Sequence, residues 1–214
     1  MFRCRKKDSP TRDHLVKAAA ALFMRHSYGM VSVDDIAVAA GIRKGSFYHH
    51  FSSKADLALA AYEFMWAEGR RELDACFSPT VPAEERLPKF SEAMYRWQKD
   101  IFDQEGKIYG CPLCSAGAEM GAQDERIRAH LKTIYDGHCA YYGSVLRDLP
   151  GLETLSLADR ERLSREMFSY TMGVLSNAKV ANEPEVIRRD LLPGLNRFLI
   201  PQPAQPVAFE QLRA

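Results

Sequence analysis

The sequence has no long apolar segment, few cysteines and no recognisable strand pattern. Its longest apolar run, Ala18 to Met24, falls far short of the roughly 18 residues that indicate a membrane span. The N-terminus is positively charged but lacks a following apolar stretch, so we expect no secretory signal and a location in the cytoplasm. The five cysteines are odd in number and irregularly spaced, which favours reduced thiols over a disulfide framework.

Internal repeats and low-complexity blocks are also missing, and nearly every segment has helical periodicity instead. Leu15, Ala19 and Leu22 recur on one face of the first expected helix. Ser32 and Ser53 each precede an acidic residue by three positions, a pattern that starts helices. We predict an all-α fold of about nine helices. They are expected near 10–26, 32–41, 43–50, 53–76, 82–104, a short segment ending at 120, 127–148, 156–180 and 184–200.

Positive charge is concentrated at one end of a chain whose net charge is only +1. Residues 1–54 hold ten Lys or Arg against four Asp or Glu, and the remainder is acidic. This asymmetry predicts that a polyanion binds at the N-terminal end. The basic residues at the start of the chain fit either a solvated tail or an arm that becomes ordered on DNA. They are Arg3, Arg5, Lys6 and Lys7.

The stretch GIRKGSFYHHF at residues 41–51 has the spacing of a helix-turn-helix. Ala37 is small where the helices cross, Gly41 suits the turn, and Phe47 anchors the second helix. That helix can enter a major groove with its N-terminal residues at base edges and its flanks at phosphates. Alternatively, Tyr48 and the histidines only cover a small core. The predicted DNA-binding residues are Ser32, Arg43, Lys44, Gly45, Ser46, Tyr48, His49, His50 and Lys54.

Arg43 and Lys44 lie at the N-terminal end of this helix, where their side chains can donate to guanine. Ser46 and His49 lie one turn further along the same face. Tyr48 and His50 at the edges suit phosphate oxygens. Ser32 and Lys54, at the starts of the flanking helices, are expected to complete a phosphate clamp by charge and by helix N-terminal amides. Phe47 and Phe51 are expected to face inward.

Residues 11–58 resemble the DNA-binding domain of the TetR family of bacterial transcriptional regulators. The matching features are Gly29, Ser32, the pattern Ile36-Ala37-x-x-Ala40-Gly41-Ile42, the run Lys44-Gly45-Ser46-Phe47-Tyr48-His49-His50-Phe51, and Lys54-x-x-Leu57. The resemblance implies a repressor that binds a palindromic operator as a homodimer and is released by a small-molecule effector. It also implies that the last two helices pair between protomers. The expected parts are a DNA-binding domain at 1–54, an effector and dimerisation domain at 55–200 and a flexible tail at 201–214.

Candidate effector-binding residues lie on or beside apolar helix faces of the second domain. Such Met and aromatic stripes also occur in ordinary cores, so each residue could instead be structural. His138 alone is equally explained as a hydrogen-bonded core histidine. The candidates are Met94, Trp97, Cys111, Tyr135, His138, Tyr142, Met167 and Tyr170.

The segment YGCPLCSAGAE resembles a GC-x7-E pattern found in one branch of the family, whose cysteine reacts with electrophiles or oxidants in some members. Cys111 occupies that position at a helix start, where the dipole is expected to lower the thiol pKa. Cys114 could then resolve a sulfenic acid as a disulfide. Two alternatives remain, namely simple packing and a zinc site. The zinc ligands would be Cys111, Cys114, His138 and Cys139.

Catalysis is not expected, and neither a cofactor nor a resident metal is predicted. The Cys111 and Cys114 pair could belong to a thiol redox protein, but a thioredoxin-like centre needs a strand-led scaffold that this sequence does not contain. No paired carboxylates or nucleophile and base arrangement suggest another enzyme class. A DNA-binding regulator explains the charge asymmetry, the turn spacing and the helical second domain together.

Overall fold

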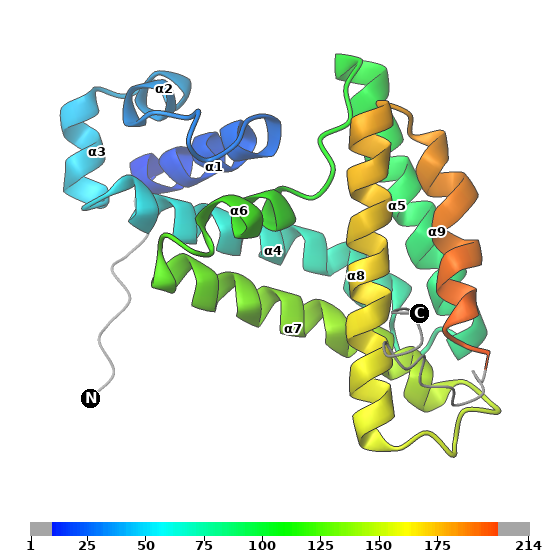
Figure 1. The fold of residues 1–214 in the computed structure, drawn as a ribbon. Helices are drawn as coiled ribbons and strands as arrows, with labels where there is room; N and C mark the ends of the chain where they lie inside the picture. Colours follow the sequence, from blue (N-terminus) through cyan, green and yellow to red (C-terminus); the bar gives the residue numbers. More distant parts are fainter. Residues whose placement is uncertain (1–9, 201–214) are drawn as a thin grey trace, which may run out of the picture.

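The computed structural model describes residues 10–200, so the basic arm and the tail at 201–214 lie outside the described residues. Within this range the chain forms nine helices and no strand, as predicted (Figure 1). None of these helices combines the length and apolar character that crossing a membrane requires. In chain order they are α1 Pro10–Arg25, α2 Val33–Ala39, α3 Lys44–His50, α4 Lys54–Cys76, α5 Ala83–Glu105, α6 Pro112–Met120, α7 Glu125–Asp148, α8 Leu157–Ala181 and α9 Glu185–Arg197.

Side-chain caps fix the helix starts that the sequence predicted. Ser32 and Ser53 accept hydrogen bonds from the third residue of α2 and of α4, and Ser156 does the same for α8. Each cap satisfies a backbone N–H that would otherwise have no partner. At the other end of α5, Gly106 adopts a φ of 67°, a left-handed conformation that favours glycine and ends the helix.

The first three helices form a small unit that packs on the start of α4 (Figure 1). Leu15, Ile36 and Phe47 are fully buried in its core. Leu57 and Tyr62 of α4 are buried in the same core, and burial of one such side chain contributes about 1.5–3 kcal/mol. The first turns of α4 therefore belong to the packing of the three-helix unit.

A tight turn joins α2 to α3. Gly41 has a φ of 67°, and the Ile42 N–H donates to the Ala37 carbonyl at 3.0 Å. Ala37 is buried and small, which allows the two helices to approach closely. The predicted helix-turn-helix is confirmed.

The larger domain contains a bundle in which α8 contacts both α7 and α9, while α5 packs on α9 (Figure 1). Tyr170 of α8 lies so close to α9 that a Cβ atom added at Gly194 would be 2.0 Å from the tyrosine ring. The Tyr170 hydroxyl also donates to the Asp190 carbonyl at 2.8 Å. These contacts lock α8 to α9.

Polar contacts connect the three-helix unit to the larger domain. Arg25 at the end of α1 donates from Nε and Nη2 to the Glu105 carboxylate of α5, at 3.0 and 2.5 Å. The Tyr109 hydroxyl donates to the same carboxylate at 2.8 Å, and the Arg25 and Tyr109 bonds lower the pKa of Glu105. In the turn after α1, the Gly29 N–H donates to Glu119 of α6 at 2.6 Å. We call the Arg25 and Glu105 pair the α1–α5 clamp.

Candidate DNA-binding face and effector cavity

Helix α3 buries one face and exposes the other. Phe47 and Phe51 pack inside, as predicted, whereas the Tyr48 side chain is 57% exposed. Among the other predicted residues of this segment, Arg43, Lys44, Gly45 and His49 are exposed, and Ser46 and His50 are half-buried. The exposed face thus presents cations, a ring and hydroxyl or imidazole donors along a short helix that stands clear of the body of the protein (Figure 1).

Lys44 has a carboxylate partner on the neighbouring helix. Its Nζ lies 2.9 Å from Oδ2 of Asp34 in α2, and this hydrogen bond raises the pKa of Lys44. Both side chains are more than half exposed, so the pair sits at the surface. When Lys44 contacts DNA, its ammonium group therefore either stays paired with Asp34 or breaks this ion pair.

Two residues predicted to contact phosphates already have hydrogen-bond partners within the protein. The Ser32 hydroxyl accepts from the Asp35 N–H at 3.1 Å and donates to its carboxylate at 2.6 Å, which also lowers the Asp35 pKa. The Lys54 Nζ donates to the carbonyls of Tyr28 and Val31, both at 3.1 Å, and burial lowers its pKa. This arrangement differs from the predicted phosphate clamp, because Asp35 of α2 already pairs with Ser32 and the turn between α1 and α2 already supplies acceptors for Lys54.

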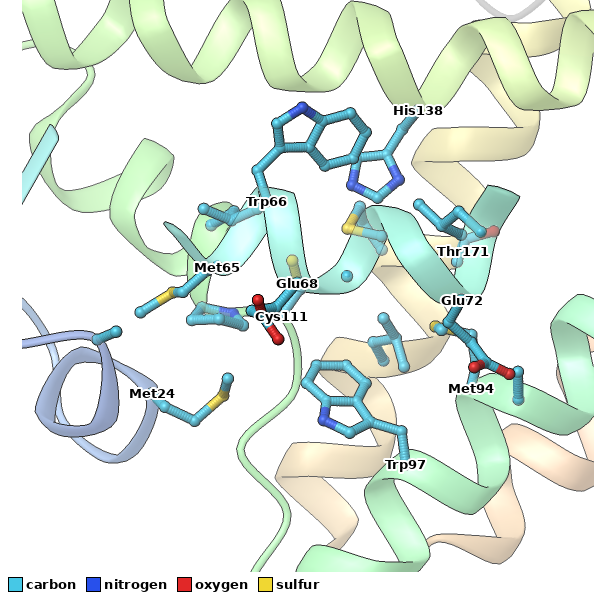
Figure 2. Close-up of a pocket in the computed structure, with 18 of the residues that line it drawn as sticks. Met24, Met65, Trp66, Glu68, Glu72, Met94, Trp97, Cys111, His138 and Thr171 are labelled. Carbon is cyan, nitrogen blue, oxygen red and sulfur yellow. The ribbon is translucent and has the colours of Figure 1, made fainter. Parts of the chain in front are cut away.

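A cavity of about 760 Å³ lies between the three-helix unit and the larger domain, a size that suits a small organic ligand (Figure 2). Helices α1, α4, α5, α7 and α8 and the start of α6 contribute to its wall. Five of the predicted effector-binding residues line it. They are Met94, Trp97, Cys111, His138 and Tyr142.

The remaining three candidates do not border the cavity. Tyr135 donates its hydroxyl to the Leu113 carbonyl at 3.1 Å, and Tyr170 is held against α9. Met167 is completely buried in the domain core. These three residues lie on apolar helix faces because they pack within the protein.

Several cavity residues were absent from the sequence prediction. Trp66, Glu68 and Glu72 enter from α4, and Met24 and Arg25 enter from α1 (Figure 2). The aromatic and Met-rich middle of α4 was a usable signal, whereas nothing in the α1 sequence indicates a role beyond the DNA-binding core. Both tryptophans of the chain line the cavity.

His138 faces the cavity as a neutral imidazole. Its ring lies 4.7 Å from the Trp66 ring and 5.5 Å from the Phe168 ring. Burial lowers the pKa of His138 to about 4, so the uncharged form is present at neutral pH. Next to it, the hydroxyls of Tyr142 and Thr171 are hydrogen-bonded to each other at 2.7 Å. The deep end of the cavity can therefore bind an uncharged polar group.

Comparison with known proteins agrees with this architecture. Residues 15–61 match the family of bacterial regulatory proteins described as the tetR family. A crystal structure of the regulatory protein TetR from Rhodobacter sphaeroides has 27% identity and a TM-score of 0.75 over 89% of this chain and 99% of that one. The chain belongs to the TetR family.

Full-length relatives of this TetR-family regulator include two transcription factors. It is 29% identical to the transcriptional regulator AcuR of Cereibacter sphaeroides, over 80% of this chain and 77% of AcuR. It is 27% identical to the transcriptional repressor NemR of Escherichia coli, over 85% of this chain and 90% of NemR. The protein is thus a DNA-binding transcriptional regulator, and its family is not enzymatic.

The thiol of Cys111 in this TetR-family regulator is protonated in the resting state. Cys111 is the N-cap residue of α6, and burial raises its pKa to about 11. Hydrogen bonds from the backbone N–H groups of Cys114 and Leu113 lower the pKa but do not offset this effect. The predicted lowering of the pKa by the helix dipole was wrong, because desolvation of this half-buried side chain outweighs the effect of the helix start.

The zinc alternative also fails on geometry. Within residues 10–200, no three His, Cys, Asp or Glu side chains are grouped so that they could hold a metal ion. The proposed ligands Cys111, Cys114, His138 and Cys139 are therefore not arranged as a site.

Proposed function

We propose that this regulator is a repressor that binds a palindromic operator as a homodimer and is released when a small molecule occupies the cavity. It would act in the cytoplasm, where the bacterial chromosome is accessible. The observation that carries the proposal is the combination of an exposed cationic α3 with a large cavity whose wall includes α4, the helix that supports α3.

The DNA-binding residues follow from exposure and chemistry. Arg43 and Lys44 at the start of α3 can donate to guanine O6 and N7, and Ser46 and His49 follow along the same helix. Tyr48 and His50 at the edges of the helix suit phosphate oxygens. A Cβ atom added at Gly45 would meet no protein atom within 4 Å, so this position faces open space that DNA can enter.

A homodimer would match the two-fold symmetry of the proposed palindromic operator. Each protomer supplies one short recognition helix, which covers only a few base pairs. Two copies related by a two-fold axis can read successive major grooves about 34–36 Å apart. The packed α8 and α9 pair is the surface through which we expect the protomers to associate, and Val180 at the end of α8 leaves its apolar side chain 85% exposed.

Release follows from differential binding of an effector. A ligand shifts the equilibrium only by as much as it prefers the conformation that cannot hold DNA. A preference of about 1–3 kcal/mol changes operator affinity by about 5- to 150-fold. The apolar part of the wall, the neutral His138 and the Tyr142 and Thr171 hydroxyls favour an effector with an apolar body and an uncharged polar group on that side. Charged side chains of both signs border the rest of the cavity, namely Lys17, Arg25, Arg96, Glu68, Glu72 and Asp100.

Selection of bound sequences from random DNA tests the DNA-binding proposal directly. We expect a palindromic consensus, and we expect Lys44→Ala and Tyr48→Ala to lose at least tenfold in affinity for it while remaining dimeric. Phe168→Leu, a change remote from α3, serves as the control and should retain operator binding. If both α3 variants keep their affinity in a mobility-shift assay at fixed salt concentration, the exposed face of α3 is not the DNA-binding surface.

A second candidate signal is an electrophile or oxidant, because the Cys111 side chain faces the cavity (Figure 2). An electron-poor alkene would form a carbon–sulfur bond with the thiolate, and the adjacent carbon would take up a proton. With hydrogen peroxide, the thiolate becomes a sulfenic acid and the peroxide is reduced to water. Attack by the Cys114 thiol would then form a disulfide and release a second water.

The raised pKa of Cys111 makes this second signal slow unless the cavity alters the thiol. We expect N-ethylmaleimide or hydrogen peroxide to release operator DNA from the unsubstituted protein, with Cys111→Ser blunting the effect. The relative NemR has been solved in a form described as reduced, which motivates the comparison of oxidised and reduced protein. If the unsubstituted protein keeps its DNA after full modification of Cys111, a reversible effector is the remaining signal.

A further inference from the structure

Helix α1 of the DNA-binding unit forms part of the cavity wall. Lys17, Ala20, Ala21, Met24 and Arg25 border the space that is also lined by the effector domain. Figure 2 shows Met24 entering from α1 on the side of the cavity that also holds Met65 and Trp97. An occupant on this side therefore contacts the DNA-binding unit itself.

The apolar side chains here suit an aromatic ring, and the charged side chains that also border the cavity are of both signs, so they favour neither a cation nor an anion. The thioethers of Met24 and Met65 and the indole of Trp97 are surfaces that pack well against rings. The Trp97 side chain is half-buried and borders the cavity, so part of the indole can contact a ligand. Bound here, a ring would gain contacts from α1, α4 and α5 at once.

One residue of the α1–α5 clamp also borders the cavity. Arg25 follows Met24 in the sequence, lines the cavity and holds Glu105 through two hydrogen bonds. Any group that separates α1 from α5 must lengthen these bonds. Since α1 packs on α2 and on α4, a shift of α1 is transmitted to the unit that carries α3.

We propose that an uncharged aromatic ring bound between Met24 of α1 and Trp97 of α5 displaces α1 from α5 and thereby lowers operator affinity. The inference rests on the proposed function and specifies how it is regulated. It assigns the signal to direct contact between the ligand and the DNA-binding unit, in addition to any movement of α4.

A tethered ring tests this without knowledge of the natural effector. Ala21→Cys is prepared in a Cys111→Ser background and treated with methyl or benzyl methanethiosulfonate. The introduced thiolate displaces methanesulfinate and forms a mixed disulfide with the small or the ring-bearing group. Matched controls are the background protein and Thr133→Cys, an exposed α7 position outside the cavity.

We expect the benzyl adduct at position 21 to bind the selected operator at least tenfold more weakly than the methyl adduct. Both controls should differ by less than twofold between reagents. Tryptophan emission reports entry of the ring, because both tryptophans line the cavity.

A benzyl adduct that alters the emission but leaves affinity within twofold of the methyl adduct overturns the inference. An adduct that changes neither quantity also counts against it, since a ring at position 21 then fails to enter the cavity. Failure of the proposed function looks different, because the background protein would then select no operator at all.

Discussion

Replacement of Asp148 by Asn tests the energetics of the larger domain, because this residue neutralises a buried arginine. Arg86 in the first turn of α5 is only 3% exposed. Its guanidinium donates to Asp148 of α7 at 2.7 Å and also to the carbonyls of Val81 and Ser144 at 3.0 and 3.3 Å. Asp148→Asn removes the negative charge while it keeps the shape of the side chain.

Breaking a buried ion pair from one side costs about 3–5 kcal/mol in general, since a charge stays buried without its counter-ion. The Asp148 side chain is 29% exposed, and two carbonyls still accept from Arg86, so we expect a smaller loss. We predict that the free energy of unfolding falls by about 2 kcal/mol, which lowers Tm by about 4–8 °C for a chain of this size.

The pH dependence of the stability difference distinguishes loss of the ion pair from simple loss of packing, because only the ion pair weakens as Asp148 becomes protonated. Hydrogen bonds from Arg147 and Arg86 lower the pKa of Asp148 to about 2. In the unfolded chain the same group titrates near pH 3.9, so its contribution is fully present above that pH and is lost as pH falls through 2. The stability gap between wild type and variant should be constant from pH 7 to 5 and roughly halved at pH 3.

Urea unfolding followed by circular dichroism, at one fixed protomer concentration, measures this gap across pH. Asp136→Asn removes a carboxylate from an exposed pair with Lys132 on α7 and should leave the unfolding midpoint unchanged. A gap that is equally large at pH 3 and pH 7, or an Asp148→Asn variant as stable as wild type, would refute the electrostatic account of Arg86.

Two further changes probe the recognition helix and the helix contacts. Asp34→Asn should free Lys44 from its carboxylate partner. On random DNA, which lacks a matched guanine, Lys44 can then contact a phosphate, so affinity should rise and the log–log salt slope should steepen by about one unit. Titration at several salt concentrations measures the slope, and an unaltered slope contradicts this. Gly194→Ala should destabilise the protein by about 1–3 kcal/mol through collision with Tyr170, whereas Gly69→Ala, which meets no atom within 4 Å, should stabilise it by up to about 1 kcal/mol. Thermal unfolding compares the two variants, and equal shifts would disprove the close contact.

Local signals in the sequence were sufficient for the helices and for the buried side of α3. Ser32 and Ser53 start helices because their hydroxyls accept from backbone N–H groups three residues later, an interaction that needs no distant partner. Gly41 and Phe47 likewise define the turn and the buried side of α3 through short-range geometry.

Properties set by distant neighbours could not be predicted in this way. The pKa of Cys111 depends on how much protein surrounds α6, and the helix start alone suggested the opposite direction. The direction of the Lys54 side chain depends on carbonyls more than twenty residues earlier in the chain. Met24 lines the cavity only because α1 happens to face α5, which no periodicity in α1 encodes.

Helix α4 joins the recognition unit to the cavity as one rod of 23 residues. At 1.5 Å per residue the rod is about 34 Å long, so a rotation of about 5° at the cavity end moves the opposite end by about 3 Å. In a two-fold dimer both ends move, and the separation of the recognition helices changes by up to about 6 Å, twice the length of a hydrogen bond. If the proposed effector rotates α4, the length of this helix would convert a sub-ångström adjustment beside the ligand into a mismatch with the pitch of DNA.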